Sequence, residues 1–220
     1  MNKFPLLLLS GLLLILTGCA FTGESGDAEE ANADLQKLKE LMYEPEEVKL
    51  NDIMKKAAEK EDWLGAVPKI EELITKGLAN GDFAEDSILC EEMSKNEFHC
   101  LLIARKYDEA MKFAERLPYV QEEIKAGKNY RSESNTVILE AGTIGKYGSW
   151  KKATAKLDAY LKKSDITKED RQKVMYFKAL SSSESDPKKC IKLLKETKAV
   201  DPESKISELI DSQIEAMERK

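Results

Sequence analysis

Few side chains in this 220-residue sequence could act as a nucleophile, a general base or a metal ligand: the sequence has one histidine, His99, and four cysteines. A nucleophile and its base must be aimed at each other, but on a helix the neighbouring Cys100 points about 100° away from His99. A metal site would favour a second ligand three or four positions on, where Leu102 and Ile103 stand instead. We therefore expect His99 to lie on an exposed or half-buried helix edge and to have no catalytic role.

Acidic residues are abundant, but they occur as neighbours on predicted helix surfaces, as at Glu91 and Glu92. Catalytic carboxylates need a cleft that separates their pKa values, and no sequence feature indicates one. The stretch "AGTIGKYGSW" also lacks the Gly-Lys-Ser/Thr ending of a phosphate-binding loop. Its glycines more simply predict close helix packing and a tight turn; they are Gly142, Gly145 and Gly148. We expect no catalytic site, no bound metal and no cofactor.

Three cysteines lie in the body of the chain: Cys90, Cys100 and Cys190. Cys90 and Cys100 are ten residues apart on one predicted helix, which separates them by about 15 Å and prevents a disulfide between them. No Cys-x-x-Cys motif is present. The sequence predicts three buried, unreactive thiols, with a disulfide involving Cys190 as the alternative.

The N-terminus begins with Lys3 and a run of apolar residues, "FPLLLLSGLLLILT", from position 4 to position 17. This run is shorter than the roughly 20 residues that a membrane-spanning helix needs, and small and acidic residues follow it. A short basic start, an apolar middle and small residues at the end predict a cleaved export signal.

The end of this run, Leu16-Thr17-Gly18-Cys19, resembles the lipobox of bacterial lipoprotein signal peptides. The resemblance implies that residues 1–18 are removed and that Cys19 becomes a lipidated N-terminus, anchored by acyl chains that each contribute about 0.8 kcal/mol per buried CH₂. The alternatives are an ordinary signal peptide with an incidental cysteine, or an uncleaved anchor. Position 20 is Ala20, not the Asp that retains lipoproteins in the inner membrane of enteric bacteria. We therefore expect attachment to the cell envelope, at the outer membrane and facing the periplasm.

Charge and composition describe the rest of the chain. Loss of Lys3 with the signal would change the net charge from −6 to −7, which disfavours nucleic acid as a partner. Residues 19–33 have little apolar content and predict a flexible tether. From Asp34 to residue 220, apolar residues recur at helical spacing among charges of both signs, which predicts one α-helical domain with solvated outer faces.

This domain repeats itself. Four small residues open similar segments at spacings of 44, 43 and 37 residues: Ala66, Ala110, Ala153 and Cys190. Three positions earlier stand Trp63, Tyr107, Trp150 and Pro187, and four positions later stand Ile70, Ala114, Leu157 and Leu194. Each segment follows another apolar-periodic segment. A helix, a turn and a helix repeated about every forty residues predict a solenoid, because each pair alone buries too little apolar surface.

The second unit, "KYDEAM" at 106–111, resembles the turn and second-helix start of a tetratricopeptide repeat, and "GSWKKA" at 148–153 is similar. "KAVDPES" at 198–204 resembles the exit of such a repeat, with Pro202 starting the next helix and Asp201 as its N-cap. The units are longer than the period of about 34 residues in that family. The resemblance implies an all-α, antiparallel helix-hairpin solenoid of about four hairpins plus a C-terminal capping helix.

In tetratricopeptide arrays, the first helices of successive pairs line a concave groove that holds peptides or helices of partner proteins. Carrying this register across gives a candidate groove set: Lys95, Asn96, His99, Asn135, Gln172 and Tyr176. The alternative is that Tyr176 belongs to the core and that the polar members are only solvated surface.

These features predict a membrane-anchored envelope lipoprotein that acts as a non-catalytic interaction scaffold or assembly factor. Its partners would be another envelope protein or peptide in the groove, and the membrane through the lipid on Cys19. One alternative is a lipoprotein that binds a small molecule or glycan for an envelope transport system, which would need an aromatic pocket from Trp63 or Trp150. A further alternative is an enzyme that acts on peptidoglycan or lipid.

Overall fold

The computed structural model describes residues 45–115, 117–183 and 185–219. This part of the chain forms ten α-helices and no strand, which confirms the all-α class. The predicted signal peptide at 1–18, Cys19, the tether at 19–33 and the first eleven residues of the predicted helical domain, 34–44, lie outside the described residues.

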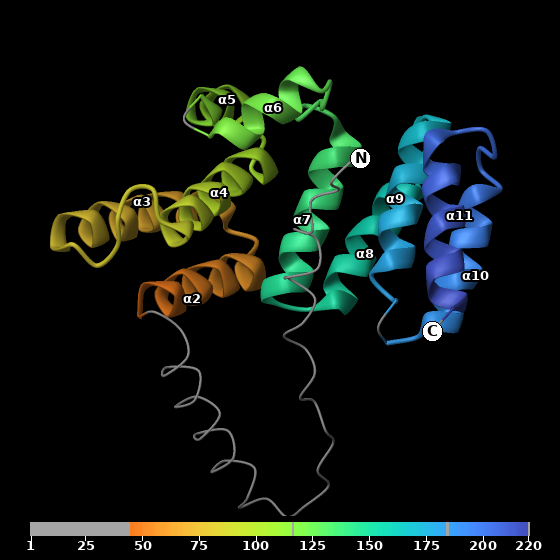
Figure 1. The fold of residues 1–220 in the computed structure, drawn as a ribbon, viewed down its shortest axis with the longest axis horizontal. Coiled ribbons are helices and arrows are strands. Elements are labelled where there is room, and N and C mark those ends of the chain that lie inside the picture. The colour runs from red at the N-terminus through yellow and green to blue at the C-terminus, as the bar shows by residue number, and fades with distance from the viewer. Residues whose placement is uncertain (1–44, 116, 184, 220) are drawn as a thin grey trace, which may run out of the picture. The chain divides into compact units, whose positions relative to one another are not determined.

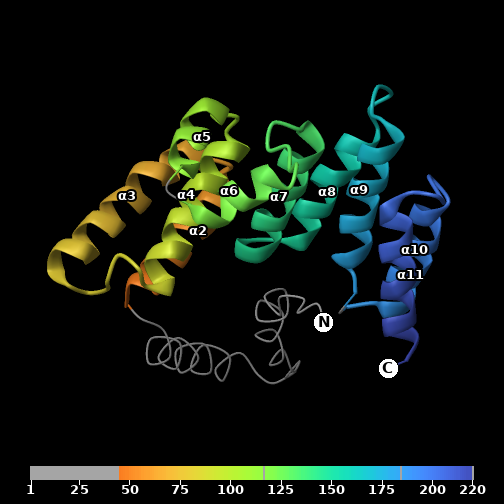
Figure 2. The same cartoon turned by 45° about the horizontal axis from the view of Figure 1, so that its top comes forward.

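The helices follow one another as consecutive packed pairs. In chain order they are α2 (Pro45–Lys60), α3 (Trp63–Asn80), α4 (Ile88–Ile103), α5 (Tyr107–Ala114), α6 (Pro118–Lys125), α7 (Glu133–Tyr147), α8 (Trp150–Leu161), α9 (Lys168–Leu180), α10 (Pro187–Lys198) and α11 (Lys205–Glu218). Helix α2 packs on α3, α4 on α5, α7 on α8, and α9 on α10. Figures 1 and 2 show these pairs in succession, with α7 near the middle and α10 and α11 at one end.

The second helix of each pair begins where the repeated pattern places it. Helices α3, α5, α8 and α10 start at Trp63, Tyr107, Trp150 and Pro187. The small residue three positions on is buried in every pair, and so is the residue four positions beyond it: Ala66, Ile70, Ala110, Ala114, Ala153, Leu157, Cys190 and Leu194. Small side chains therefore sit where the second helix meets its neighbours closely. Asp62 and Asp186 are the N-caps of α3 and α10. Their carboxylates accept hydrogen bonds from the backbone N–H groups of Gly65 and Lys189 at 3.0 and 2.9 Å.

Helix α6 was not predicted from the sequence. Residues 118–125 form only two turns, and Pro118 stands at the first helical position, where its missing N–H costs nothing. Val120 of α6 and Leu117 before it are buried together with Phe98 and Ala110. The extra helix lies between Ala110 and Ala153, whereas the similar spacing of 44 residues between Ala66 and Ala110 occurs without one.

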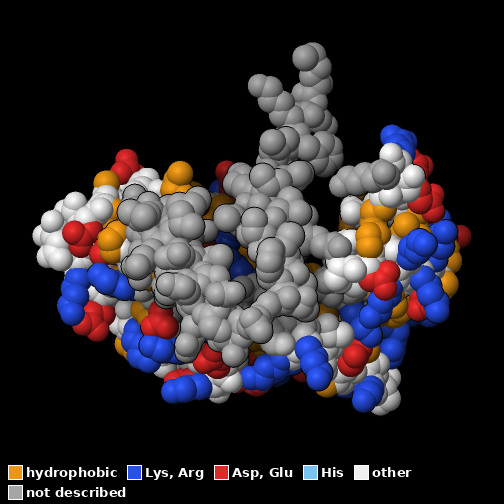
Figure 3. All heavy atoms as spheres, turned by 90° about the horizontal axis from the view of Figure 1, so that it is seen from below, with side chains coloured by type: hydrophobic (Ala, Val, Ile, Leu, Met, Phe, Trp, Pro, Cys, Tyr) orange, Lys and Arg blue, Asp and Glu red, His pale blue; other side chains and the backbone are white. Residues whose placement is uncertain are grey.

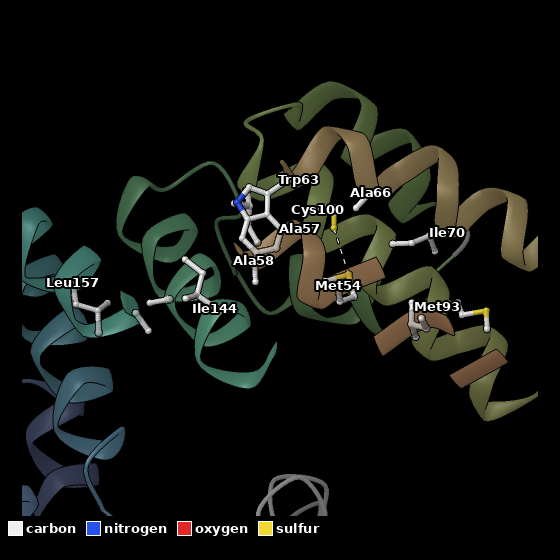
Figure 4. Packing of buried hydrophobic residues seen from close by; sticks show 14 of the residues in the cluster. Met54, Ala57, Ala58, Trp63, Ala66, Ile70, Met93, Cys100, Ile144 and Leu157 are labelled. Atoms are coloured by element: carbon white, nitrogen blue, oxygen red, sulfur yellow. Dashed lines mark hydrogen bonds between the residues drawn. The ribbon is translucent and has the colours of Figure 1, made fainter. Parts of the chain in front are cut away.

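One core cluster joins non-consecutive pairs. It contains Met54 of α2, Ile70 of α3, Met93 of α4, Ile144 of α7 and Leu157 of α8, all fully buried. Figure 4 shows this packing at α2, where Cys100 Sγ lies 3.8 Å from Met54 Sδ. Helix α2 contacts α7 as well as α3, so the first and third pairs touch directly.

Two glycines of α7 fit the predicted close packing. A β-carbon at Gly145 would lie 2.5 Å from Cζ3 of Trp150, and one at Gly142 would lie 3.3 Å from Cζ of Phe177. Gly148 forms the end of α7, before α8 begins. The predicted packing role of these glycines is confirmed.

The three described cysteines are free and buried, as predicted. Cys90 and Cys100 both lie on α4, near its two ends. Burial raises the pKa of each thiol, that of Cys100 to about 12, so these thiols remain protonated at neutral pH. The alternative of a disulfide involving Cys190 is not observed.

The last helix begins later than predicted. Helix α11 starts at Lys205, and its N-cap is Ser204, whose hydroxyl accepts from the Ser207 N–H at 3.1 Å. The predictions that Asp201 caps this helix and that Pro202 starts it are wrong, because residues 201–204 form a turn in which the Ser204 N–H donates to the Asp201 carbonyl at 3.4 Å. Helix α11 packs on α9 and α10. Leu209 of this helix is 56% exposed, whereas Ile210 is buried.

The described surface carries charges of both signs. Where described residues are visible in Figure 3, lysine and arginine side chains are interspersed with aspartate and glutamate. No helix in the described ranges has both the length and the apolar character needed to cross a membrane.

Candidate functional site

Three members of the predicted groove set lie together on α4: Lys95, Asn96 and His99. Asn96 is buried, and its amide nitrogen donates to the Glu92 carbonyl at 2.8 Å. Its Oδ1 accepts from the Tyr147 hydroxyl at 3.1 Å. Asn96 therefore joins α4 to α7, and its polar atoms already have partners within the fold.

His99 is half-buried beside Phe98, with ring centroids 6.1 Å apart. Burial is the main cause that lowers its pKa to about 3, and the positive charges of Lys95, Lys128 and Lys146 act in the same direction. The imidazole is therefore neutral at pH 7. Its position confirms the expected half-buried helix edge.

The lysines around His99 lie over tyrosine rings. The Nζ atoms of Lys95, Lys128 and Lys146 are 5.5, 4.9 and 4.8 Å from the ring centroids of Tyr119, Tyr130 and Tyr147, respectively. Such contacts stabilise a cation by roughly 0.5–1 kcal/mol at exposed positions. Lys146 also pairs with Glu92, and Lys128 with Glu123. The polar groups in this region largely satisfy one another.

The other three members of the groove set lie elsewhere. Asn135, near the start of α7, donates to the Asn129 carbonyl at 2.7 Å and so closes a local turn. Tyr176 is half-buried against the core formed by α9, α10 and α11, as the alternative interpretation proposed. The six residues do not form one continuous surface.

Gln172 is fully buried, which contradicts its assignment to an open groove. Its amide nitrogen lies within hydrogen-bond distance of the Thr197 carbonyl, the Asp201 carbonyl and the Ser207 hydroxyl, at 3.3, 2.9 and 3.0 Å. Its side chain points into the junction of α9, α10 and α11, because its partners come from α10 (Thr197), from the following turn (Asp201) and from α11 (Ser207).

The structure instead contains an open cleft between α3, α4 and the α5–α6 segment. Its volume is about 880 Å³. Apolar side chains line it from both sides: Ile74 and Leu78 on α3, and Phe113, Leu117 and Tyr119 on the α5–α6 segment. Leu78 is 37% exposed, so this apolar lining is only partly covered by the chain itself. We call this feature the α3–α6 cleft.

Carboxylates surround the α3–α6 cleft: Glu71, Glu85, Asp86, Glu91, Glu97 and Glu122. No described Lys, Arg or His lines it. Apart from Glu97, these carboxylates make no ion pair with any residue that the structure describes. Among the described residues, carboxylates without an ion-pair partner therefore lie next to exposed apolar atoms in this cleft.

A second groove, between α2 and α3, provides a contrast. It has a volume of about 440 Å³ and is lined by acidic and basic residues together. Two of its carboxylates, Glu46 and Glu72, are paired with Lys49 and Lys76 at 3.0 and 2.5 Å. The α3–α6 cleft differs from this groove because most of its described carboxylates have no ion-pair partner among the described residues.

The floor of the α3–α6 cleft offers little chemistry. Burial, and secondarily the charge of Glu85, raises the pKa of Cys90 and keeps its thiol protonated. Burial and the nearby carboxylates of Glu123 and Glu91 raise the pKa of Tyr119, whose buried hydroxyl has no hydrogen-bond partner among the described residues. The Cys90 thiol and the Tyr119 hydroxyl are therefore both protonated at neutral pH.

Neither tryptophan contributes to this cleft. Trp63 is 5% exposed at the start of α3, and Trp150 packs on Gly145 at the start of α8. The sequence carried a partial signal for the cleft, because Glu71, Ile74, Thr75 and Leu78 share one face of α3. Its opposite wall depends on α6, which was not predicted.

Within the described residues, no group of three or more His, Cys, Asp and Glu side chains is placed to hold a metal ion. No protein-family model, curated protein or solved structure matches this chain.

Proposed function

We propose that this chain is a lipid-anchored protein of the bacterial cell envelope that binds another protein as a non-catalytic scaffold or assembly factor. Its anchor would be the lipid on Cys19, supported by the resemblance of residues 16–19 to a lipobox. Its binding domain would be a tetratricopeptide-like helical solenoid. The observation that carries the proposal is the open, partly apolar α3–α6 cleft, where carboxylates such as Glu71, Glu91 and Glu122 have no ion-pair partner among the described residues.

Support for the solenoid comes from the four consecutive helix pairs and from the buried small residue near the start of each second helix. Helix α6 and the contact between α2 and α7 depart from a regular array. In this interpretation the departures are useful, because α6 forms one wall of the cleft. Arrays of stacked helix pairs commonly present extended binding surfaces, and this chain would use a side cleft for that purpose.

The proposal assigns no catalytic step to His99 or to the cleft carboxylates. The imidazole is neutral and half-buried, and its surrounding lysines lie over tyrosine rings. The cleft carboxylates lie beside apolar side chains, which suits the recognition of a peptide segment.

The test is chemical crosslinking in intact cells that produce the full-length chain with a C-terminal tag. After solubilisation of the envelope in a non-ionic detergent, we expect one or a few proteins to be captured reproducibly and to co-elute with the chain on size exclusion. A chain that remains monomeric and captures nothing reproducible contradicts the proposal. A rise in melting temperature with a small molecule or glycan, in the absence of a protein partner, would favour the alternative transport function.

A further inference from the structure

We propose that the α3–α6 cleft binds a basic amphipathic helix of the partner protein, with apolar side chains on the cleft floor and lysine or arginine side chains toward its rim. This inference deepens the scaffold function proposed above and rests on it. It assigns both the place of binding and the chemistry of the bound segment.

The apolar lining supports a helical occupant. Ile74 and Leu78 stand one turn apart on α3, and Phe113, Leu117 and Tyr119 face them from the α5–α6 segment. A helix that enters such a groove anchors itself by apolar side chains at positions i, i+3, i+4 and i+7. The volume of about 880 Å³ lies within the range of well-formed ligand sites.

The charges support a basic occupant. Carboxylates lie on several sides of the cleft: Glu71 on α3, Glu85 and Asp86 before α4, Glu91 on α4, and Glu122 on α6. Elsewhere on the described surface, many acidic side chains are paired, as Glu61 is with Lys152 and Lys156. A partner that brings lysine or arginine supplies positive charge, which no described lining residue of the cleft provides. Electrostatic complementarity of this kind selects one partner over others.

The same charges disfavour other occupants. Nucleic acid and anionic lipid head groups would be repelled by a row of unpaired carboxylates. A second copy of this chain also carries net negative charge. A basic peptide segment is therefore the partner that the cleft fits best.

The binding test uses the full-length chain in a non-ionic detergent. The probe is a fluorescein-labelled model peptide of about 14 residues, or four helical turns, with leucine at i, i+3, i+4 and i+7 and lysine at the other positions. A second peptide carries glutamate in place of lysine, and a third carries the lysine composition in a scrambled order that breaks the apolar face. Fluorescence anisotropy should show binding of the first peptide only, and raising NaCl from about 0.05 M to about 0.5 M should weaken it.

Matched charge variants locate the site. The cleft variant combines Glu71→Gln, Glu91→Gln and Glu122→Gln. The control variant combines Glu59→Gln, Glu203→Gln and Glu208→Gln, which are likewise exposed and outside the cleft. Both variants lose three negative charges. We expect roughly tenfold weaker binding in the cleft variant and less than twofold weaker binding in the control variant.

An apolar pair of variants tests the floor. Leu78→Ser should weaken peptide binding severalfold, whereas Leu209→Ser, at a more exposed leucine of α11, should not change it. Circular dichroism melting of each variant checks that the fold is retained. Equal weakening by both charge variants, binding of the glutamate peptide, or unchanged binding in the cleft variant would each overturn the inference.

The test separates this inference from the scaffold function. A protein captured from intact cells as strongly by the cleft variant as by the parent would leave the scaffold function in place and overturn the cleft assignment. Binding of the lysine peptide that depends on the cleft carboxylates, without any captured protein, would support the cleft chemistry and count against the scaffold function.

Discussion

The Ser204 hydroxyl donates a hydrogen bond of 2.5 Å to Oε1 of Gln172, although 32 residues separate the two in sequence. Gln172 lies on α9, and Ser204 caps α11. The opposite end of the Gln172 amide lies against the carbonyls of Thr197 and Asp201 and the hydroxyl of Ser207. One buried side chain therefore holds together the three helices at this end of the described domain.

Gln172→Leu should lower the free energy of unfolding by about 3 kcal/mol, because it leaves several buried polar groups without their partner. Urea unfolding followed by circular dichroism measures this change. Ser204→Ala should cost about 1 kcal/mol through the lost cap, and the double variant should cost less than the sum, because both changes remove the same bond. A Gln172→Leu variant as stable as the parent that loses partner capture would restore Gln172 to a binding surface.

This residue shows why the predicted groove set was only partly useful. A glutamine among charged residues, in "DRQKVMYF", indicates surface because a buried amide needs partners that helical spacing does not reveal. Those partners come from residues 197–207, which form the end of α10, the following turn and the start of α11. Local pattern therefore identified the helix but not the direction that this polar side chain takes.

Gly145→Ala should destabilise the domain by roughly 1–2 kcal/mol. The added β-carbon would lie 2.5 Å from the Trp150 ring, and the cost of moving that ring should exceed the gain in helix propensity of about 1 kcal/mol. Gly142→Ala is the matched control on the same helix, since its β-carbon would lie 3.3 Å from Phe177. In thermal unfolding, the melting temperature of the Gly142 variant should equal or exceed that of the parent, and the melting temperature of the Gly145 variant should be lower. The reverse order would show that Trp150 moves aside freely.

The single histidine gives the domain a defined pH dependence. In the unfolded chain His99 takes up a proton near pH 6.5, whereas in the fold its pKa is about 3. Between these values the unfolded state binds more protons than the folded state. The contribution of the neutral His99 to the free energy of unfolding is therefore fully present above pH 6.5 and is lost as the pH falls below it. We expect a loss of roughly 1–2 kcal/mol between pH 7 and pH 5, measured by urea unfolding at both values.

His99→Gln is the control for this effect, because it removes the only imidazole in the chain. The variant should show little change in stability between pH 7 and pH 5. Carboxylates with lowered pKa values, such as Glu61 and Glu133, contribute a further loss only at lower pH. If the free energy of unfolding of the parent and of the variant fell equally between pH 7 and pH 5, a group other than His99 would titrate in that range.

The repeated pattern predicted the helix pairs but not the α3–α6 cleft, for a physical reason. The starts of α3, α5, α8 and α10 follow from turn residues, caps and a small side chain at a close contact, all of which are local. The α3–α6 cleft depends on α6, whose two turns are too short to establish an apolar period. It also depends on which carboxylates form an ion pair with a lysine. Glu92, for example, pairs with Lys146, which is 54 residues away in sequence. Such pairing is a property of tertiary structure.

Cys19→Ser tests the proposed anchor directly. The proposal requires a thiol at position 19, because the diacylglycerol is attached through a thioether that serine cannot form. Fractionation of cells that produce the full-length chain should place the parent with the membranes and the Cys19→Ser chain largely outside them, since a lost acyl anchor removes about 0.8 kcal/mol of membrane affinity per buried CH₂. Labelling with a radioactive fatty acid should mark the parent alone.

Cys190→Ser is the matched control, because Cys190 is a buried thiol of the described domain and its replacement should not affect membrane retention. A Cys19→Ser chain that remains with the membranes like the parent would favour an uncleaved N-terminal anchor, and the binding domain would then have to be tied to the membrane by residues 4–17 instead of by a lipid.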